Sequence, residues 1–457
     1  MSDKMRKSEK KNTDANRIVV IGAGASGLMA ALTAAEAGAE VVIVDGNEKA
    51  GKKLFATGNG RCNFTNTNCD GSEEAVLRHF NGTATAFIKE AMSRFTAHDC
   101  ISFFEEHGVL ARVEDEGRTY PYSGQAQAIV EALTSGCEAA AVEFVLGDRA
   151  VDISFADSGF VVACESGRNI FCDKVIIACG GRAGLKFGST GDGYGFAKKF
   201  GHSLVAPKPA LVAAESNDSF IADLKGVRAS AKVTLKLDGE AIAEDKGEVQ
   251  FTGTGVSGIC VFDLSRHMDA PRPKKKKKSG KKAESAEALE KHYCIVIDLV
   301  PDMNIKDLTK LLRGWAKTVC GTDEKGHVHG DIDIADLEKM LCGIVNRKLA
   351  AVIAGLASED EKTGEVFCDV NKLMLRSVMM LKGLRVSVAS TKGWDDAQTT
   401  SGGVKCDETD SMTMESKLTK NLYLCGEVLD VDGRCGGYNL QWAWASGFIA
   451  GKSAAGK

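Results

Sequence analysis

The stretch RIVVIGAGASGLMAALTAAEAGAEVVIVD, residues 17–45, decides the fold of this chain. Residues 18–21 form an apolar strand, and Gly22, Gly24 and Gly27 complete a G-x-G-x-x-G where the strand must turn into a helix. The first glycine permits the tight turn, the second lets the backbone approach a pyrophosphate, and the third lets the helix pack close to the strand. The helix N-terminus offers its amides and positive dipole end to phosphates. The stretch therefore predicts a Rossmann-type dinucleotide-binding unit.

A second apolar strand at residues 41–44 ends in Asp45, whose carboxylate can accept hydrogen bonds from an adenosine ribose. A glycine-rich turn alone is weak evidence, because it can be only a turn. Here the strand, the helix, the Gly38 stop and the terminal acid all stand in register. The pattern predicts a bound dinucleotide and leaves FAD and NAD open as alternatives.

The size and composition of the chain permit a large enzyme. Its 457 residues, 44% of them hydrophobic, are enough for two or three domains with real cores. The net charge of −4 favours neither nucleic acid nor an anionic membrane surface as a partner. The first sixteen residues lack the apolar core of a signal peptide, and no apolar run approaches the ~18 residues that span a bilayer. We expect a cytoplasmic protein without a membrane span.

The fifteen cysteines are scattered, odd in number and free of any C-x-x-C or His/Cys cluster. We expect them to be mostly buried, reduced thiols, with no disulfide framework and no metal site. The lack of a C-x-x-x-x-C near the first nucleotide fold also argues against a dithiol flavoenzyme.

A loop rich in glycine, GKKLFATGNGRCNFTN, follows the second strand at residues 51–66. Its glycines would let backbone amides contact a flat or charged ligand. Lys52, Lys53 and Arg61 could neutralise phosphate or flavin charge, with Arg61 supplying a planar fork. We therefore predict ligand contact here, the alternative being a flexible surface loop.

Two tyrosines and an arginine stand out in the segment ARVEDEGRTYPYSG, residues 111–124. The segment separates amphipathic helical patterns at 83–107 and 125–135. The turn around its proline could present Tyr120 or Tyr122 to a substrate as a hydrogen-bond donor, with Arg118 beside them. An ordinary structural tyrosine is an equal alternative.

The segment VIIACGGRAGLKFGSTGDGYGFAKKFG, residues 175–201, is the second strong signal. An apolar strand at 174–178 runs into Gly180 and Gly181, and Asp192 stands where the following helix begins. Such a junction suits close approach to a large cofactor. It is not a second G-x-G-x-x-G, so we expect one dinucleotide to be held permanently while any nicotinamide donor visits and leaves.

The middle of the chain changes pattern. Residues 204–263 and 293–299 alternate with period two, which predicts an inserted β domain, and residues 301–357 predict several short helices. Between the two β stretches, PRPKKKKKSGKK at 271–282 holds seven lysines and an arginine. A solvated loop is expected there, with targeting or RNA binding as the alternative, and we assign it no role.

The C-terminal stretch NLYLCGEVLDVDGRCGGYNLQWAWASGFIAG, residues 421–451, returns to the nucleotide fold. A strand ends near Gly426, a glycine-rich loop follows, and a helix begins near Tyr438. This second helix N-terminus could stabilise negative charge on a reduced flavin ring. Trp442 and Trp444 are expected to pack the helix rather than contact a cofactor.

Together, the motifs GAGASGLMAA, GKKLFATGNGRCNFTN, GSTGDGYGFAKKFG, GEVQFTGTGVSG, TTSGGV and CGEVLDVDGRCGGYNLQWAWASG resemble the bacterial NAD(P)/FAD-dependent oxidoreductase family that includes the 3-dehydro-bile-acid Δ4,6-reductase. The resemblance implies an α/β architecture with a discontinuous Rossmann-type FAD-binding domain at 17–203 and 385–457. It further implies an inserted β-barrel-like domain at 204–300 and 358–384 and a small helical domain at 301–357. It favours FAD as the bound cofactor, with NADH or NADPH as co-substrate.

The resemblance also carries cofactor-binding residues onto this chain. They are Gly22, Ala23, Gly24, Ala25, Ser26 and Gly27 for the pyrophosphate, Asp45 for the adenosine ribose, and Lys53, Gly60, Arg61, Cys62, Asn63, Gly180, Gly181, Asp192, Gly426, Glu427, Gly436, Gly437, Tyr438, Asn439 and Leu440 for the rest of the cofactor. The family usually has Glu at the position of Asp45 and Gly at the position of Asn59. The shorter acid is expected to weaken adenosine binding without abolishing it.

The implied activity is reduction of an activated C=C bond of an enone, in a 3-oxo-Δ4 or 3-oxo-Δ4,6 bile-acid or steroid intermediate. Tyr120, Arg118 and Arg434 are the candidate catalytic residues, as donor to the carbonyl or as acid, on chemistry and loop position. A flavoprotein oxidase or dehydrogenase of another small molecule is one alternative. A non-catalytic flavin-binding interaction protein is another. The expected partner is a small-molecule substrate, and the sequence predicts no oligomeric state.

Overall fold

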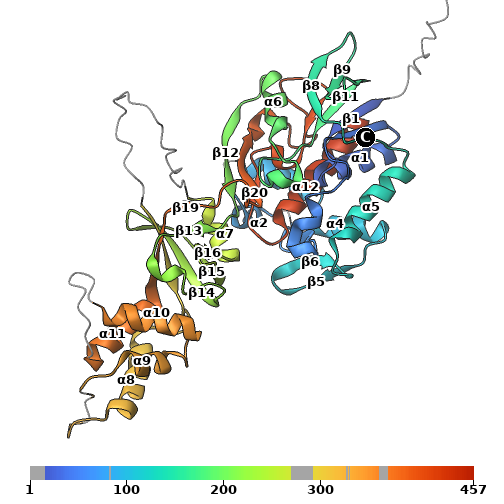
Figure 1. Ribbon diagram of the computed structural model, residues 1–457. Coiled ribbons are helices and arrows are strands. Elements are labelled where there is room, and N and C mark those ends of the chain that lie inside the picture. The colour runs from blue at the N-terminus through green and yellow to red at the C-terminus, as the bar shows by residue number, and fades with distance from the viewer. Residues whose placement is uncertain are drawn as a thin grey trace, which may run out of the picture. The chain divides into compact units, whose positions relative to one another are not determined.

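The computed structural model describes residues 16–70, 72–81, 84–268, 292–325, 328, 330–359 and 369–456. The chain divides into two compact units, one made of Met1–Pro209 and Thr399–Lys457 and the other of Ala210–Gln398 (Figure 1). The lysine-rich segment 271–282 and the first residue of the pattern at 83–107 lie outside the described residues.

The first unit is built on a parallel five-stranded sheet in the order β21-β11-β1-β2-β7. Its strands are β1 Arg17–Ile21, β2 Glu40–Asp45, β7 Glu143–Leu146, β11 Lys174–Ile177 and β21 Leu422–Leu424. The apolar residues of β1 are almost completely buried, because β1 has a paired strand on both sides. The predicted Rossmann-type architecture is confirmed, with the last strand arriving from the C-terminal part of the chain.

Seven helices of the described residues belong to this unit. They are α1 Ala25–Glu36, α2 Glu73–His79, α3 Thr85–Arg94, α4 Ala97–Glu106, α5 Ala126–Ala139, α6 Asp192–Lys199 and α12 Tyr438–Ala455. The pattern at 83–107 is two helices because Thr96 forms a capping box with Asp99, which starts α4 afresh. Trp442 and Trp444 of α12 are buried, which confirms their predicted packing role.

Helices α1 and α12 pack closely because two glycines of α12 face α1. A Cβ at Gly447 would lie 2.5 Å from the Ser26 carbonyl oxygen, and one at Gly451 would lie 2.4 Å from the Ala30 carbonyl oxygen. Only glycine permits such backbone approach, so these positions fix the spacing of the two helices.

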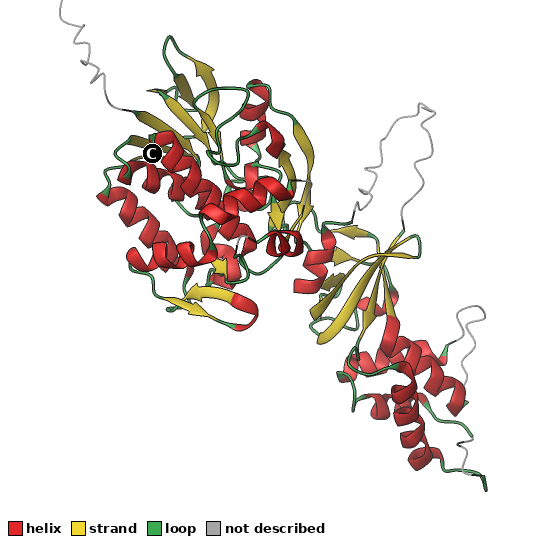
Figure 2. Ribbon diagram, turned by 180° about the vertical axis from the view of Figure 1, so that it is seen from behind, coloured by secondary structure: helices red, strands yellow, loops and turns green. Residues whose placement is uncertain are grey.

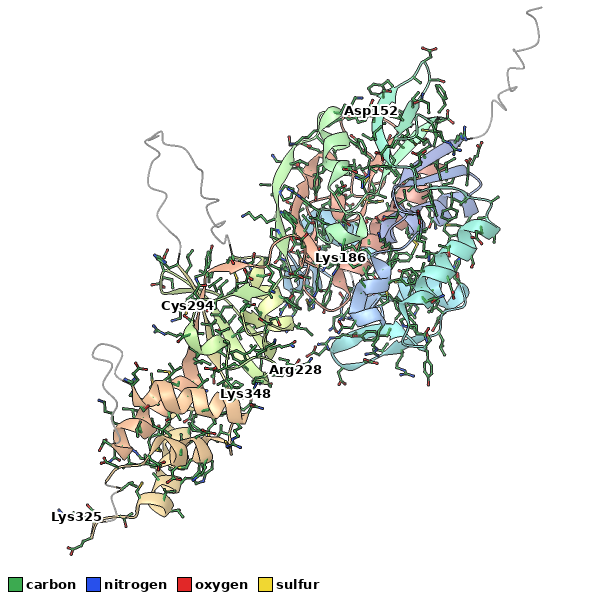
Figure 3. The ribbon with its side chains drawn as sticks, viewed as in Figure 1. Asp152, Lys186, Arg228, Cys294, Lys325 and Lys348 are labelled. Atoms are coloured by element: carbon green, nitrogen blue, oxygen red, sulfur yellow. The ribbon has the colours of Figure 1, made fainter. Side chains whose placement is uncertain are left out.

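Smaller strands complete the unit. They are β3 Thr65–Asn66, β6 Arg118–Pro121 and β5 Ala111–Val113 in one sheet, β10 Asn169–Cys172, β9 Phe160–Cys164 and β8 Ala150–Phe155 in a second, β12 Leu204–Ala210 with β20 Thr399–Val404, and β22 Asp432–Gly433 with β4 Phe80–Asn81. Asp152 of β8 (Figure 3) forms an ion pair of 2.6 Å with Lys199. This pair ties α6 to the sheet.

The second unit contains a seven-stranded sheet in the order β18-β17-β14-β15-β16-β13-β19. Its strands are β13 Ala214–Glu215, β14 Arg228–Leu237, β15 Glu240–Phe251, β16 Gly255–Ser257, β17 Tyr293–Asp298, β18 Leu384–Val388 and β19 Ser390–Thr391, and its helices are α7 Ile259–Ser265, α8 Ile305–Cys320, α9 Ile334–Leu341, α10 Arg347–Ser358 and α11 Val370–Gly383. Figure 2 shows α8 to α11 gathered at one end of the strands, and their buried faces share one core with the sheet.

Two sequence expectations need correction here. The stretch 358–384, expected to be β-rich, contains α11, because Asp369 caps a helix whose apolar residues recur at helical spacing. Residues from 385 onward, expected in the nucleotide fold, first form β18, which pairs with β17. The first unit resumes only at Thr399, and it extends to Pro209 rather than to residue 203.

No helix within the described ranges combines the length and the apolar character required to cross a bilayer.

Candidate functional site

The turn between β1 and α1 is made by backbone contacts that require glycine. Gly22 has φ +110°, and a Cβ there would lie 2.5 Å from the Ala178 carbonyl oxygen of the neighbouring strand's end. A Cβ at Gly27 would lie 1.9 Å from the Gly22 carbonyl oxygen. Beside Gly24, by contrast, no atom lies within 4 Å of a Cβ position. The first and third glycines thus close the turn, and the second borders open space in which a ligand can approach the backbone.

Asp45 lies at this turn, where the sequence predicted it. Its Oδ2 accepts a hydrogen bond of 2.7 Å from the Ala23 amide, and its Oδ1 accepts one of 2.7 Å from the Asn47 amide. The carboxylate therefore braces the turn, and the Ala23 amide is engaged by Asp45. The amides of Ala25, Ser26 and Gly27 lie at the N-terminus of α1, which Gly24 begins without any side-chain cap.

The second helix N-terminus is that of α12. Gly437 precedes it with φ +100°, and a Cβ there would lie 2.5 Å from the Thr65 carbonyl oxygen. No side chain caps this helix either, so the amides of Tyr438, Asn439 and Leu440 have no side-chain cap. The two helices run in the same direction, because Gly447 faces Ser26 and Gly451 faces Ala30. The α12 N-terminus thus lies beyond the α1 N-terminus by roughly eight residues, or about 12 Å, on the side from which both helices start.

The side chains of this second loop form contacts with other parts of the protein. Asn439 accepts a hydrogen bond of 2.7 Å from the Gly433 amide and donates one of 2.9 Å to the Gly433 carbonyl. The ring of Tyr438 is buried and stacks on His79 at 4.2 Å. Gly436 has φ +125° and its carbonyl accepts a hydrogen bond of 2.8 Å from Asn66. These side-chain contacts hold the loop that precedes α12.

A polar cluster joins four separate segments of the first unit. Lys53 forms an ion pair of 2.9 Å with Glu427, and the other oxygen of Glu427 accepts a hydrogen bond of 2.9 Å from the Thr400 amide. The Thr400 hydroxyl accepts hydrogen bonds from the Arg182 and Ala183 amides at 2.8 and 3.0 Å. A Cβ at Gly181 would lie 2.3 Å from that hydroxyl. The structure thus brings together Lys53, Gly181 and Glu427, three of the residues that the resemblance assigned to the cofactor.

Three further predicted residues lie around this cluster. Gly180 has φ +71° with open space beside it. Gly426 has φ +76°, and a Cβ there would lie 2.3 Å from the Ser26 hydroxyl. Asp192 begins α6 and forms an ion pair of 2.7 Å with Arg149. The Asp192 carboxylate thus already has a cationic partner within the protein.

The predicted glycine-rich loop at residues 51–66 contains the sequence GRCN at residues 60–63 and is here named the GRCN loop. It adopts an unusual backbone. Gly58, Asn59, Gly60 and Cys62 all have positive φ, between +55° and +85°. Asn59 fits this region because asparagine tolerates the left-handed conformation better than most residues. The Cys62 side chain is completely buried, and burial raises the pKa of its thiol to about 12, so it is an inert thiol at neutral pH. The Asn63 side chain accepts a hydrogen bond of 3.0 Å from the Thr119 amide.

Arg61 of the same loop contacts Tyr120 and Glu114. Its guanidinium lies 4.0 Å from the centroid of the Tyr120 ring, and its two terminal nitrogens donate to the two Glu114 oxygens at 2.5 and 3.3 Å. The Arg61 charge thus has a protein carboxylate as its partner.

The three candidate catalytic residues have different surroundings. Arg118 forms an ion pair with Glu116. The Tyr120 hydroxyl has no hydrogen-bond partner among the described residues. The Arg434 amide donates a hydrogen bond of 2.8 Å to the His79 carbonyl, which continues the β22–β4 pairing.

Three residues of this region escaped the sequence analysis. Asn66 donates to the carbonyls of Gly436 and Glu116 and so joins β3, the β5–β6 turn and the α12 loop. His79 stacks on Tyr438, and burial together with Arg434 lowers its pKa to about 4. Thr400 organises the polar cluster. Asn66 and Thr400 lie inside quoted motifs, but no spacing rule assigns them a partner.

Comparisons with known proteins agree with this geometry. The family model of the HI0933-like protein Rossmann domain matches residues 16–453. The 3-dehydro-bile acid delta(4,6)-reductase of Clostridium scindens is 35% identical, covering 96% of this chain and 99% of that protein. The ribosomal RNA dihydrouridine synthases of Haemophilus influenzae and Escherichia coli are 28% and 27% identical, covering 95% and 94% of this chain and 97% and 95% of theirs.

A solved structure shares the fold. The 3-ketosteroid-delta4-(5alpha)-dehydrogenase from Rhodococcus jostii RHA1 superposes with a TM-score of 0.50 at 15% identity, covering 98% of this chain and 99% of that one. At this identity the likeness concerns the fold alone.

Proposed function

This chain belongs to the HI0933-like Rossmann-domain family, and from that premise we propose that it is an FAD-dependent oxidoreductase. It uses NADH or NADPH to reduce a C=C bond conjugated to a carbonyl, in a 3-oxo bile-acid or steroid intermediate. The substrate class rests on the Clostridium scindens reductase, which matches this chain at 35% identity along almost its whole length. Family members on one fold can differ in substrate, so the residues of the site must support the chemistry.

The residues present suit FAD. Open space beside Gly24 admits a pyrophosphate to the amides at the α1 N-terminus, and the α12 N-terminus offers a second set of amides about 12 Å further along. Asp45 borders the first set, and Lys53 with Glu427 supplies charge and hydrogen-bonding groups near the turn. A flavin bound here supplies a hydride for the carbon β to the carbonyl.

The observation that carries the catalytic assignment is the Tyr120 hydroxyl, which has no partner among the described residues. Hydride addition at the β carbon places negative charge on the carbonyl oxygen. A phenol that donates a hydrogen bond to this oxygen lowers the barrier, because the interaction strengthens as the charge develops. In this proposal, Tyr120 donates to the carbonyl and the α carbon takes its proton from water or a second acid.

An anaerobic reduction tests this function. The purified protein is reduced with NADH or NADPH, a 3-oxo-Δ4,6 bile acid is added, and the flavin absorbance is followed while the products are analysed. Return of the oxidised spectrum together with a product in which one of the two C=C bonds is reduced supports the proposal, because one reduced flavin supplies one hydride. A reducible flavin that this substrate does not reoxidise would point to the oxidase or dehydrogenase alternative. A flavin that neither nucleotide reduces would favour a non-catalytic flavin-binding protein.

A second candidate function is the reduction of a base in RNA. The uracil ring also holds a C=C bond conjugated to a carbonyl, and the two ribosomal RNA dihydrouridine synthases match more than nine tenths of this chain. The sequence at 271–282, with seven lysines and an arginine, would favour a polyanionic substrate, whereas the net charge of −4 opposes one. The same reduced protein is therefore mixed with ribosomal RNA, and dihydrouridine is measured by mass spectrometry. Dihydrouridine without any reduced bile acid would replace the first candidate with this one.

A further inference from the structure

The Tyr120 ring is held between a loop and a cation. Tyr120 lies on β6, the middle strand of the β3-β6-β5 sheet, directly opposite Arg112 of β5 (Figure 1). A Cβ at Gly58 would lie 3.6 Å from the Cε1 atom of the ring, so the left-handed loop borders its edge. The Arg61 guanidinium lies over its face at 4.0 Å. Loop and cation together define where the ring can lie.

Glu114 fixes the plane of that guanidinium. Two nitrogens of Arg61 donate to the two carboxylate oxygens of Glu114, at 2.5 and 3.3 Å. A two-point contact of this kind sets the orientation of a planar group as well as its position. Hydrogen bonding to Arg61 holds the pKa of Glu114 below its usual range, and the same bond raises the pKa of Arg61. Both groups therefore stay charged throughout the neutral range.

We propose that Arg61 is a positioning residue, which Glu114 orients and which in turn holds the Tyr120 ring so that its hydroxyl points at the substrate carbonyl. This inference rests on the proposed function, in which Tyr120 is the donor. It differs from the sequence expectation, which gave Arg61 to the flavin. The Arg61 charge is shared between Glu114 and the Tyr120 ring, so FAD affinity should depend little on it.

The structure contains a matched control. Arg112 of β5 lies over the ring of Tyr122, which directly follows β6, at the same distance of 4.0 Å, and Tyr122 is 56% exposed. Arg112→Met therefore removes an equivalent stack from a tyrosine that the proposed function does not use. Any general effect of losing a guanidinium from this sheet appears in both variants.

The kinetic test uses Arg61→Met, Glu114→Gln, Tyr120→Phe, the double variant Arg61→Met/Tyr120→Phe and the control. We expect Arg61→Met to lower kcat about tenfold, and Glu114→Gln less, because a misdirected donor loses transition-state stabilisation. KM and the FAD dissociation constant should stay within about twofold, and Arg112→Met should match the wild type. The double variant should be no slower than Tyr120→Phe alone, since Arg61 acts through that hydroxyl. Arg61→Lys should not restore kcat, because an ammonium lacks the flat face and the two-point contact.

Two results would overturn the inference. One is a fall in FAD affinity of more than about tenfold in Arg61→Met with kcat unchanged at saturating FAD, which would make Arg61 a cofactor ligand. The other is an additive effect in the double variant, which would show that Arg61 acts independently of Tyr120.

A chemical readout separates this inference from the function on which it rests. Nitration by tetranitromethane, mapped by mass spectrometry on the FAD-loaded protein without substrate, measures how well each ring is shielded. Arg61→Met should speed nitration of Tyr120 and leave Tyr122 unchanged, whereas Arg112→Met should do the reverse. Unchanged nitration of Tyr120 would show that Arg61 does not hold the Tyr120 ring. Absence of enone reduction with the expected nitration would reject the proposed function but would leave the contact of Arg61 with the Tyr120 ring supported.

Discussion

The two glycine-rich turns of the first unit, residues 22–27 and 433–440, end in the same feature, a helix N-terminus without a side-chain cap, but they are built differently. In the first, Gly22 and Gly27 pack against backbone carbonyl oxygens of the turn and of the adjacent strand end, and the one bracing side chain, Asp45, belongs to the same motif. The second is held by side chains from distant parts of the chain, Asn66 and His79, together with Asn439 within it. A turn made by backbone contacts can therefore be predicted from the positions of its glycines, whereas a turn held by distant side chains cannot.

Gly27→Ala gives the largest expected effect and tests the backbone-made turn. The new Cβ would lie 1.9 Å from the Gly22 carbonyl oxygen, and no flexible side chain is there to move aside. We expect the free energy of unfolding to fall by about 3 kcal/mol or more, with loss of bound flavin. Urea denaturation and the flavin content of the purified protein measure both.

Gly24→Ala is the matched control, because it adds the same methyl group to the same turn. Its φ is −85° and no atom lies within 4 Å of the new Cβ, so the free energy of unfolding should change by less than about 1 kcal/mol. FAD affinity should nevertheless fall about tenfold or more, since the methyl group occupies the space expected for the pyrophosphate. Equal FAD affinity in Gly24→Ala and the wild type would place the pyrophosphate elsewhere.

Asn66→Ala tests the turn made by side chains. Asn66 is 1% exposed and donates to the carbonyls of Gly436 and Glu116, so its loss removes the buried amide that joins these two loops and leaves the half-buried Gly436 carbonyl without that donor. We expect the free energy of unfolding to fall by about 1–3 kcal/mol, with weaker FAD binding at the α12 N-terminus. Urea denaturation and FAD titration are the measurements.

Asn68→Ala provides the comparison for that variant. Asn68 also donates to the Glu116 carbonyl, at 3.1 Å, but it is exposed and does not reach Gly436. Its loss should cost less than about 0.5 kcal/mol and leave FAD binding unchanged. If both variants behaved alike, the link from Asn66 to Gly436 would not hold the second turn.

The same contrast explains what the sequence could predict. The strand, turn and helix at residues 17–45 follow from local pattern, because every contact of Gly22 and Gly27 lies within the unit that the motif describes or at the end of the adjacent strand. The contact between Arg61 and Glu114 could not be predicted from the sequence. Glu114 directly follows β5, and no periodicity in the sequence places it beside the GRCN loop. Helix α11 did not follow, because the assignment of residues 358–384 to the β domain came from the resemblance and not from the helical spacing of residues 370–383.

Acidification gives a smaller effect that also acts on the second turn. Burial, with Arg434 and Arg78, lowers the pKa of His79 to about 4, against ~6.5 in an unfolded chain. Because the folded pKa is the lower one, the stability linked to His79 is complete above pH ~6.5 and is lost as the pH falls toward 4. Half-burial reduces the expected loss to about 1–2 kcal/mol. Thermal unfolding of the wild type between pH 7.5 and 4.5 measures it.

The variant His79→Phe isolates the contribution of His79 protonation to this loss of stability. Phenylalanine keeps a ring against Tyr438 but cannot bind a proton, so this variant should lose less stability on acidification than the wild type. Burial also lowers the pKa of His202, which lies 3.3 Å from Glu408, and this contributes a background common to both proteins. The difference between the two curves is therefore the quantity to compare. Parallel curves would show that protonation of His79 does not contribute to the loss of stability on acidification.

The smallest expected effect concerns Asn59, where the family resemblance led us to expect glycine. Asn59 is exposed at φ +55°, a region that costs asparagine little and glycine nothing. Asn59→Gly would remove that small strain but would also give the unfolded chain more freedom, and the two terms offset to within about 0.5 kcal/mol. Asn59→Val should instead cost about 1–2 kcal/mol, because a β-branched residue resists positive φ. Urea denaturation of the two variants decides whether the backbone of this loop, rather than a contact of the Asn59 side chain, is what the position requires.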